Sequence, residues 1–322
     1  MLGCGLRNRE QSHTMNVRPI LTGAAGAKPR AAIFLSGGGS NAERLLAGLA
    51  AAPADTPWTA AALVTDAPET SRARELGARF NVPVVAEDIR AFYRAHGETR
   101  VSLATPKGRE LRTAWTGRLR AALQPLAPDF GVLAGFVPLC NITGDFPCLN
   151  VHPGDLTYLK DGRRWLVGLH TVPIERAILE GLDHLRSSVI QALPFTDGGE
   201  DMDNGPLLGV SEEVPIDFDG ATLDDLRAAA AARPAQRPPG GFNDRLEAVA
   251  KRNQERLKEG GDWVVLPRAV AMFARNRYGV DDAGGLWLRI NQAWQPIETV
   301  VFGADTAEVR FRGGPGTVGV SP

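Results

Sequence analysis

The sequence lacks three features that would each assign the chain to a class of protein at once. No apolar run approaches the ~20 residues needed to span a bilayer, so no membrane-spanning segment is predicted. The formal net charge is −1, which argues against a nucleic-acid backbone as the main partner. The three cysteines, Cys4, Cys140 and Cys148, form no Cys-x-x-Cys pair. This pattern argues against a disulfide framework or a zinc knuckle; no metal site is predicted, and reduced thiols in the cytoplasm are expected.

The first 29 residues also lack the long apolar segment of a secretory signal. They are polar and mixed in composition, and Met15 offers an alternative start. The sequence therefore predicts a flexible N-terminal extension over 1–29, followed by one domain over 30–322. The apolar content of 43% over 322 residues is that of an ordinary globular protein with a sizeable core.

Short apolar runs alternate with helical patterns from residue 31 to about residue 190. Wholly apolar strands that alternate with helices are typical of a parallel sheet covered on both faces. The predicted fold class is α/β, a mostly parallel twisted sheet with helices on both faces, similar to a Rossmann fold. Ligands bind beyond the carboxyl ends of the strands in such sheets. The expected strands are 31–36, 59–65, 82–85, 130–134 and 147–151, and the expected helices are 41–51, 69–80, 109–126 and 173–180.

The second half of the chain has a less regular pattern. Residues 217–245 are predicted to be an insertion or linker that includes a helix capped by Thr222. Residues 246–314 are expected to form C-terminal helices and a small hairpin. Asn243 is expected to cap the first of these helices, and Pro267 is expected to stand in the first turn of the next.

The segment Ser36–Asn41 is glycine-rich and lies between a predicted strand and a predicted helix. Its glycines allow a tight turn, and the helix N-terminus offers free N–H groups to an anion. Gly37-x-Gly39-x-x-Ala42 also fits the dinucleotide fingerprint, with Asp66 at the end of the next strand. This motif alone leaves open a phosphate site, a dinucleotide site in a nicotinamide-dependent oxidoreductase, and a turn without a ligand.

Two further motifs carry groups suited to acyl transfer. Asn150 and His152 are two residues apart on a predicted strand, so their side chains face the same way. An amide there can hold a developing oxyanion, and an imidazole can move a proton. Asp203 lies in an Asp-Asn-Gly-Pro segment, which is either a plain turn or a loop that delivers a carboxylate. A carboxylate beside His152 would favour the charged imidazolium.

Together, the motifs make the chain similar to the folate-dependent formyltransferase family, and most similar to phosphoribosylglycinamide formyltransferases. The resemblance follows the same motif order and approximate spacing from about residue 30 to residue 290. It implies an enzyme of the cytoplasm, a monomer or homodimer, that uses 10-formyltetrahydrofolate as co-substrate. The acceptor that it implies is a phosphorylated small-molecule amine. The first candidate is glycinamide ribonucleotide, a substrate of purine biosynthesis. The matching motifs are Ser36–Asn41, Leu133–Phe136, Leu149–Pro153, Gly168–Thr171 and Asp203–Pro206.

The resemblance also implies roles for individual residues. Asn150 and protonated His152 would hold the oxyanion, while Asp203 would keep His152 charged and relay a proton. The substrate-binding residues that it implies are Gly38, Gly39, Ser40, Asn41, Arg112 and His170. The residues that it implies around the pterin are Phe136, Val137, Pro138, Leu139, Cys140, Asp201 and Met202.

Three departures from the family pattern concern the edge of this site. Ile190 stands where the family commonly has a second histidine, and no clear match exists for the acid that meets the ribose hydroxyls, with Asp262 the nearest candidate. The loop 156–168 is longer than its counterpart and carries Lys160, Arg163 and Arg164. An amino-sugar acceptor and a catalytically dead folate-binding homologue therefore remain as alternatives.

Overall fold

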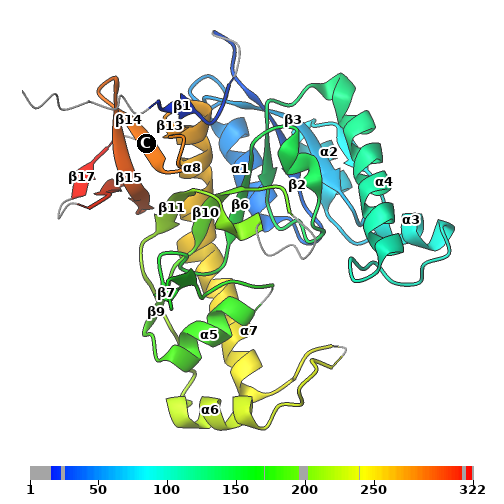
Figure 1. Cartoon of the computed structure of the whole chain (residues 1–322), viewed down its shortest axis with the longest axis vertical. Helices are drawn as coiled ribbons and strands as arrows, with labels where there is room; N and C mark the ends of the chain where they lie inside the picture. Colours follow the sequence, from blue (N-terminus) through cyan, green and yellow to red (C-terminus); the bar gives the residue numbers. More distant parts are fainter. Residues whose placement is uncertain are drawn as a thin grey trace, which may run out of the picture.

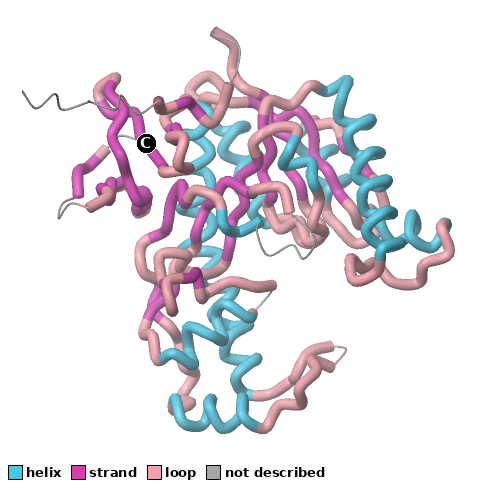
Figure 2. Tube along the Cα trace, in the orientation of Figure 1, coloured by secondary structure: helices cyan, strands magenta, loops and turns pink. Residues whose placement is uncertain are grey.

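The computed structural model describes residues 16–22, 26–169, 171–195, 202–238, 240–313 and 317–320. Thirteen strands within these ranges join in one mixed sheet (Figures 1 and 2). Its parallel half comprises β4, β3, β2, β5 and β6, in that spatial order, and β6 then pairs antiparallel with β10. These strands are β2 (Arg30–Phe34), β3 (Thr59–Thr65), β4 (Val84–Ala86), β5 (Phe130–Leu133), β6 (Cys148–His152) and β10 (Ser188–Ala192).

Helices cover both faces of the parallel half, as the sequence predicts. Alternate residues of each strand enter two separate apolar cores, because successive side chains point to opposite faces. One core packs against α1 (Ser40–Ala51), α2 (Ala73–Phe80) and α8 (Trp263–Ala274). The other packs against α3 (Ile89–Ala95) and α4 (Pro106–Leu123).

The C-terminal strands extend this sheet instead of forming a separate hairpin. The turn at Asn291–Gln292 has positive φ at both residues, which suits a tight hairpin between β14 and β15. Arg18 and Pro19 form β1 on the outer edge, paired with β13, so this part of the predicted flexible extension is a strand. The strands are β11 (Leu207–Ser211), β13 (Tyr278–Val280), β14 (Leu286–Ile290), β15 (Ala293–Phe302), β16 (Ala307–Phe311) and β17 (Thr317–Gly319).

A third apolar core lies outside the sheet, where α5 (Val172–Glu180), α6 (Leu223–Ala231) and α7 (Arg245–Leu257) project below it (Figure 1). The segment 217–245 thus contains a packed helix, with Leu226 fully buried. The expected capping box of Thr222 and Asp225 is present at α6. Asp244 caps α7 in place of the predicted Asn243, because the Asp244 carboxylate accepts the Glu247 N–H at 2.8 Å.

The predicted helix start at Pro267 is wrong. Helix α7 continues through a π-helical segment, Lys258–Asp262, directly into α8, which begins at Trp263. Pro267 therefore lies inside α8, where its missing N–H leaves the Trp263 carbonyl without its usual partner. Within the described ranges, none of the helices combines the length and the apolar character that crossing a bilayer requires.

Candidate active site

Strand β6 presents Asn150 and His152 on one face of the sheet, as their spacing predicts. Leu149 and Val151 enter the core on the opposite face. Asn150 is half-buried at the strand's carboxyl end, and His152 is only 4% exposed. The alternation of side chains along one strand thus places an amide and an imidazole on the same side.

The Asp203 segment lies against β10, the neighbour of β6. The Pro206 carbonyl accepts a hydrogen bond from the Gln191 N–H at 3.0 Å. Gly205 is packed so closely on this strand that a Cβ there would overlap the Gln191 carbonyl oxygen. As a result, the Asn150 side-chain amide donates to Asp203 Oδ1 at 3.4 Å. Two chain segments that are distant in sequence therefore meet, as the motifs predict.

His152 does not make the contact that the sequence leads us to expect. Its Nε2 lies 2.7 Å from the backbone carbonyl oxygen of Leu166. A carbonyl only accepts, so Nε2 carries a proton and Nδ1 is the nitrogen left to accept one. In the described part of the chain, Asp203 pairs with Asn150 and His152 with Leu166, and no hydrogen bond or ion pair joins His152 to Asp203.

The unusual loop 156–168 supplies this carbonyl and reaches both sides of the site. It forms a short hairpin, β7 (Leu159–Lys160) with β8 (Arg163–Arg164). The Arg164 guanidinium donates to the backbone carbonyls of Asp203 and Gly205. Gly154 is also required here, since a Cβ would overlap the Leu166 carbonyl oxygen. The basic residues of this loop were visible in the sequence, but their contact with the Asp203 segment was not.

The glycine-rich segment forms the expected tight turn at the carboxyl end of β2. Gly39 has φ +63° and is the N-terminal cap of α1, and a Cβ there would press on Leu35 and Leu76. Gly38 borders open space, and Ser40 is half-buried. Backbone N–H groups at the start of α1 are thus positioned to meet an anion.

Ser36 joins this turn to the two neighbouring strand ends. Its hydroxyl donates to Asp66 Oδ1 at 2.5 Å and accepts the Val137 N–H at 2.9 Å. Burial raises the pKa of the Asp66 carboxyl, and the Ser36 hydrogen bond partly counteracts this. The carboxylate that a dinucleotide ribose would require is therefore buried and occupied, which weakens the oxidoreductase alternative.

Asn41 points into the protein. Its amide donates to Asp262 Oδ2 at 2.9 Å, while Asp262 Oδ1 accepts the Ser187 hydroxyl at 2.5 Å. Asn41 and Asp262 are 9% and 7% exposed. This internal network joins α1, the π-helical segment and the start of β10. To bind a ligand as predicted, either side chain would have to give up a hydrogen bond of this network.

The predicted pterin segment Phe136–Cys140 lies beside this turn, after β5. Phe136 stacks on Trp115, whose ring centroid is 6.4 Å away, and Val137 is 48% exposed. The Leu139 carbonyl accepts a hydrogen bond from Arg112 at 2.5 Å. Arg112 is 5% exposed and supports this segment from α4; its predicted contact with a phosphate remains a prediction.

The structure describes some of the other predicted residues in this region and not others. Pro138 is half-buried, and Cys140 is a buried free thiol whose pKa is raised by burial. Ile190 is fully buried and lies opposite Asn150 in the antiparallel pair of β6 and β10. His170 and Asp201 lie outside the described residues, and only the backbone of Met202 is described, in a short 3₁₀ turn with Asp203.

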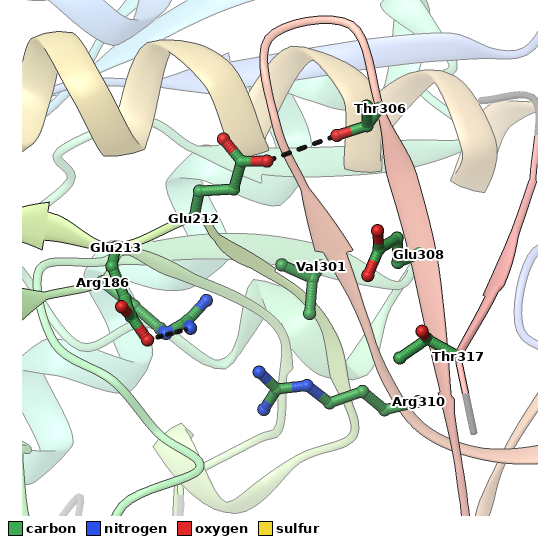
Figure 3. Close-up of a pocket in the computed structure, with 8 residues that line it drawn as sticks. All are labelled: Arg186, Glu212, Glu213, Val301, Thr306, Glu308, Arg310 and Thr317. Atoms are coloured by element: carbon green, nitrogen blue, oxygen red, sulfur yellow. Dashed lines mark hydrogen bonds and ion pairs between the residues drawn. The ribbon is translucent and has the colours of Figure 1, made fainter.

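A cavity of about 430 Å³ lies farther along the same sheet, beside β15 and β16 (Figure 3). Arg186 on its wall is paired with Glu213 at 2.7 Å, and Glu212 accepts a hydrogen bond from Thr306 at 3.3 Å. Its other charged groups are Glu308 and Arg310. None of the predicted site residues lines this cavity, so it is separate from the cluster around Asn150.

The fold is that of an open α/β protein, and the polar cluster lies at the carboxyl edge of its parallel strands, where such sheets bind ligands. No family model and no curated protein matches the sequence. Among solved structures, the chain is similar to the phosphoribosylglycinamide formyltransferase of Coxiella burnetii, with 16% identity, 84% and 96% of the two chains covered, and a TM-score of 0.53.

A second similar structure is glycinamide ribonucleotide transformylase 1 from Symbiobacterium toebii. The identity is 22%, the coverage is 79% of this chain and 91% of that chain, and the TM-score is 0.48. At the level of the fold, the chain is thus like the Coxiella burnetii enzyme over most of its length.

Proposed function

We propose that this protein is an enzyme that transfers a formyl group from 10-formyltetrahydrofolate to a primary amine. The observation that carries the proposal is the meeting of Asn150 with Asp203 beside His152, at the edge where such sheets bind ligands. The fold of a phosphoribosylglycinamide formyltransferase adds support. The proposed reaction needs an oxyanion donor, a proton carrier and a carboxylate, and the cluster contains one of each.

In the proposed reaction, the amine nitrogen attacks the formyl carbon of the donor, and the carbonyl oxygen becomes an oxyanion. Asn150 has two amide protons, one of which Asp203 accepts, and the other, which has no acceptor among the described residues, would donate to the oxyanion. His152 is the second donor, through Nδ1 when the ring is protonated. One proton moves from the attacking nitrogen to N10 of the folate, with Asp203 as its carrier, as the C–N10 bond breaks. The products are the formamide and tetrahydrofolate.

The acceptor that we propose is a phosphorylated amine, with glycinamide ribonucleotide the first choice. Support comes from the open turn at Gly38 and Ser40, since the first N–H groups of a helix lack intrahelical partners and can bind an anion. The folate is expected at Phe136–Cys140, where Val137 is exposed. The Val137 N–H and the Leu139 carbonyl already have internal partners, so other backbone groups of this segment would contact the pterin.

An amine panel with the purified chain tests this proposal. Formation of tetrahydrofolate is followed from 10-formyltetrahydrofolate with glycinamide ribonucleotide, its dephosphorylated form, amino sugars and amino-sugar phosphates. Transfer to the ribonucleotide, lost on dephosphorylation, supports the proposal. Asp203→Asn serves as the matched control, because it keeps the shape of the side chain and removes the charge. Failure to formylate any amine, or full activity of Asp203→Asn, would contradict it.

A further inference from the structure

The Arg164 guanidinium is the only described side chain that the structure places on two backbone carbonyls of the Asp203 segment at once. Nη1 donates to the Asp203 carbonyl, and Nη2 donates to the Gly205 carbonyl at 3.0 Å. The guanidinium is a rigid planar fork, so two contacts fix the direction of the segment as well as its distance. The 203–204 and 205–206 peptide units are thereby held by one group.

The hairpin that carries Arg164 is itself anchored on α5. Lys160 forms an ion pair with Glu180 at 2.5 Å, and Arg176 donates to the carbonyls of Trp165 and Val167 at 2.9 Å. Lys160 and Arg176 also each lie 4.7 Å from the centre of the Trp165 ring. The hairpin is therefore a firm support and not a free loop.

The same hairpin also contacts the other half of the site. Leu166, two residues after Arg164, provides the carbonyl that holds His152 Nε2 at 2.7 Å. The Asp203 segment also packs closely against strand β10, at Gly205. One structural unit thus contacts both His152 and the segment that carries Asp203, so it can set their relative position.

Retaining a half-buried cation here requires compensation. Burial lowers the pKa of the Arg164 guanidinium, and the negative charge of Asp203 partly counteracts that effect. Neutral hydrogen-bonding side chains or a water could satisfy two carbonyls without this cost. An arginine in this position is explained if its charge attracts Asp203 and its planar guanidinium fixes the segment that carries Asp203.

We propose that Arg164 is a positioning residue that clamps the Asp203 segment to the β7–β8 hairpin and so presents the Asp203 carboxylate to Asn150 and the reacting amine. The inference rests on the proposed formyl transfer. Arg164 acts through Asp203, and both of its described contacts are to backbone carbonyls. The unusual length and charge of loop 156–168 would then serve the geometry of the site.

The test compares Arg164→Gln and Arg164→Lys with Arg163→Gln, which alters the exposed neighbour on the same hairpin. Three quantities are measured for each folded variant: hydrogen exchange of the backbone amides of residues 203–205 and 207, and kcat and KM for the best amine. Arg164→Gln is expected to speed exchange and to lower kcat about 100-fold, with a nearly unchanged KM for the amine. Lysine, which can reach one carbonyl, should give an intermediate loss. Arg163→Gln should stay within about twofold of the parent chain.

The exchange measurement separates this inference from the proposed function. Unchanged exchange in Arg164→Gln would overturn the clamp, whatever the activity. Faster exchange with unchanged kcat would overturn the positioning role. If the parent chain formylates no amine, the proposed function and the positioning role fail together, and exchange alone then decides whether Arg164 holds the segment.

Discussion

Asn150 and Asp203 lie 53 residues apart in the chain, yet the Asn150 amide donates to the Asp203 carboxylate at 3.4 Å. The contact exists because β6 and β10 are neighbours and the Asp203 segment folds back on β10 through Gly205 and Pro206. It orients the amide so that one N–H faces Asp203, and we propose that the other donates to the ligand. The first prediction concerns this amide.

Replacing Asn150 with alanine is expected to lower kcat/KM for formyl transfer by about 100- to 1,000-fold, or roughly 3 kcal/mol, since it removes an oxyanion donor. Steady-state rates with saturating folate donor measure the effect. Gln191→Ala is the control, because it removes an amide from the adjacent strand β10, where residue 191 lies opposite Leu149. An Asn150→Ala enzyme with a third of the parent rate would show that the amide is not an oxyanion donor.

His152→Ala is expected to remove transfer and to destabilise the fold. The ring is 4% exposed, and its loss leaves the Leu166 carbonyl without its donor. We expect the free energy of unfolding to fall by about 1–3 kcal/mol. Urea unfolding gives this value, and rates are then taken where the variant is folded. Transfer at the parent rate by the folded variant would refute a catalytic role for His152.

The Asp203 segment should tolerate no side chain at position 205. Gly205→Ala places a Cβ on the Gln191 carbonyl oxygen, so the segment must move away from β10. We expect a loss of about 1–3 kcal/mol in the free energy of unfolding, together with lower activity. Gly117→Ala is the matched control, since its Cβ meets nothing within 4 Å and α4 gains a better helix former. Equal melting temperatures for the two variants would contradict the packing argument.

Asp262 is expected to make the stability of the protein depend on pH. Burial raises the pKa of its carboxyl, and hydrogen bonds from Ser187 and Asn41 counteract only part of this. The folded protein thus keeps the proton to a higher pH than the unfolded chain. The free energy of unfolding should fall as pH rises from about 4 to the folded-state pKa, by at most about 1.4 kcal/mol per pH unit. Asp66, whose pKa is also raised, contributes in the same direction.

Asp262→Asn removes the Asp262 part of this slope and leaves the Asp66 part, and urea unfolding across that pH range would measure the difference. An amide at 262 can still accept from Ser187. The Asn41 amide can turn so that its Oδ1, which has no partner among the described residues, accepts from the new N–H groups. The stability of the variant relative to the parent should therefore grow with pH and then level off. Asp282→Asn, an exposed site, controls for loss of a surface charge. Parallel curves for the parent and Asp262→Asn would exclude this role.

Much of the fold could be predicted from local patterns. The apolar run Thr59–Thr65 coincides with β3, and the Thr222 capping box marks the start of α6. The predicted element boundaries were wrong where the local pattern did not decide which residue begins a helix. Asp244 took the cap expected of Asn243, and Pro267 entered a helix because α7 and α8 continue through the π-helical segment.

The sequence by itself determined the alternation of strands and helices, the common face of Asn150 and His152, and the turn at Gly39, since these depend on neighbours along the chain. Only the tertiary structure decided the partners of the polar groups. Asn41 meets Asp262, His152 meets Leu166, and Arg164 meets the Asp203 segment because of the order of strands and the path of the loops. A buried polar group bonds to whichever partner the packing brings near, and no local pattern encodes that choice.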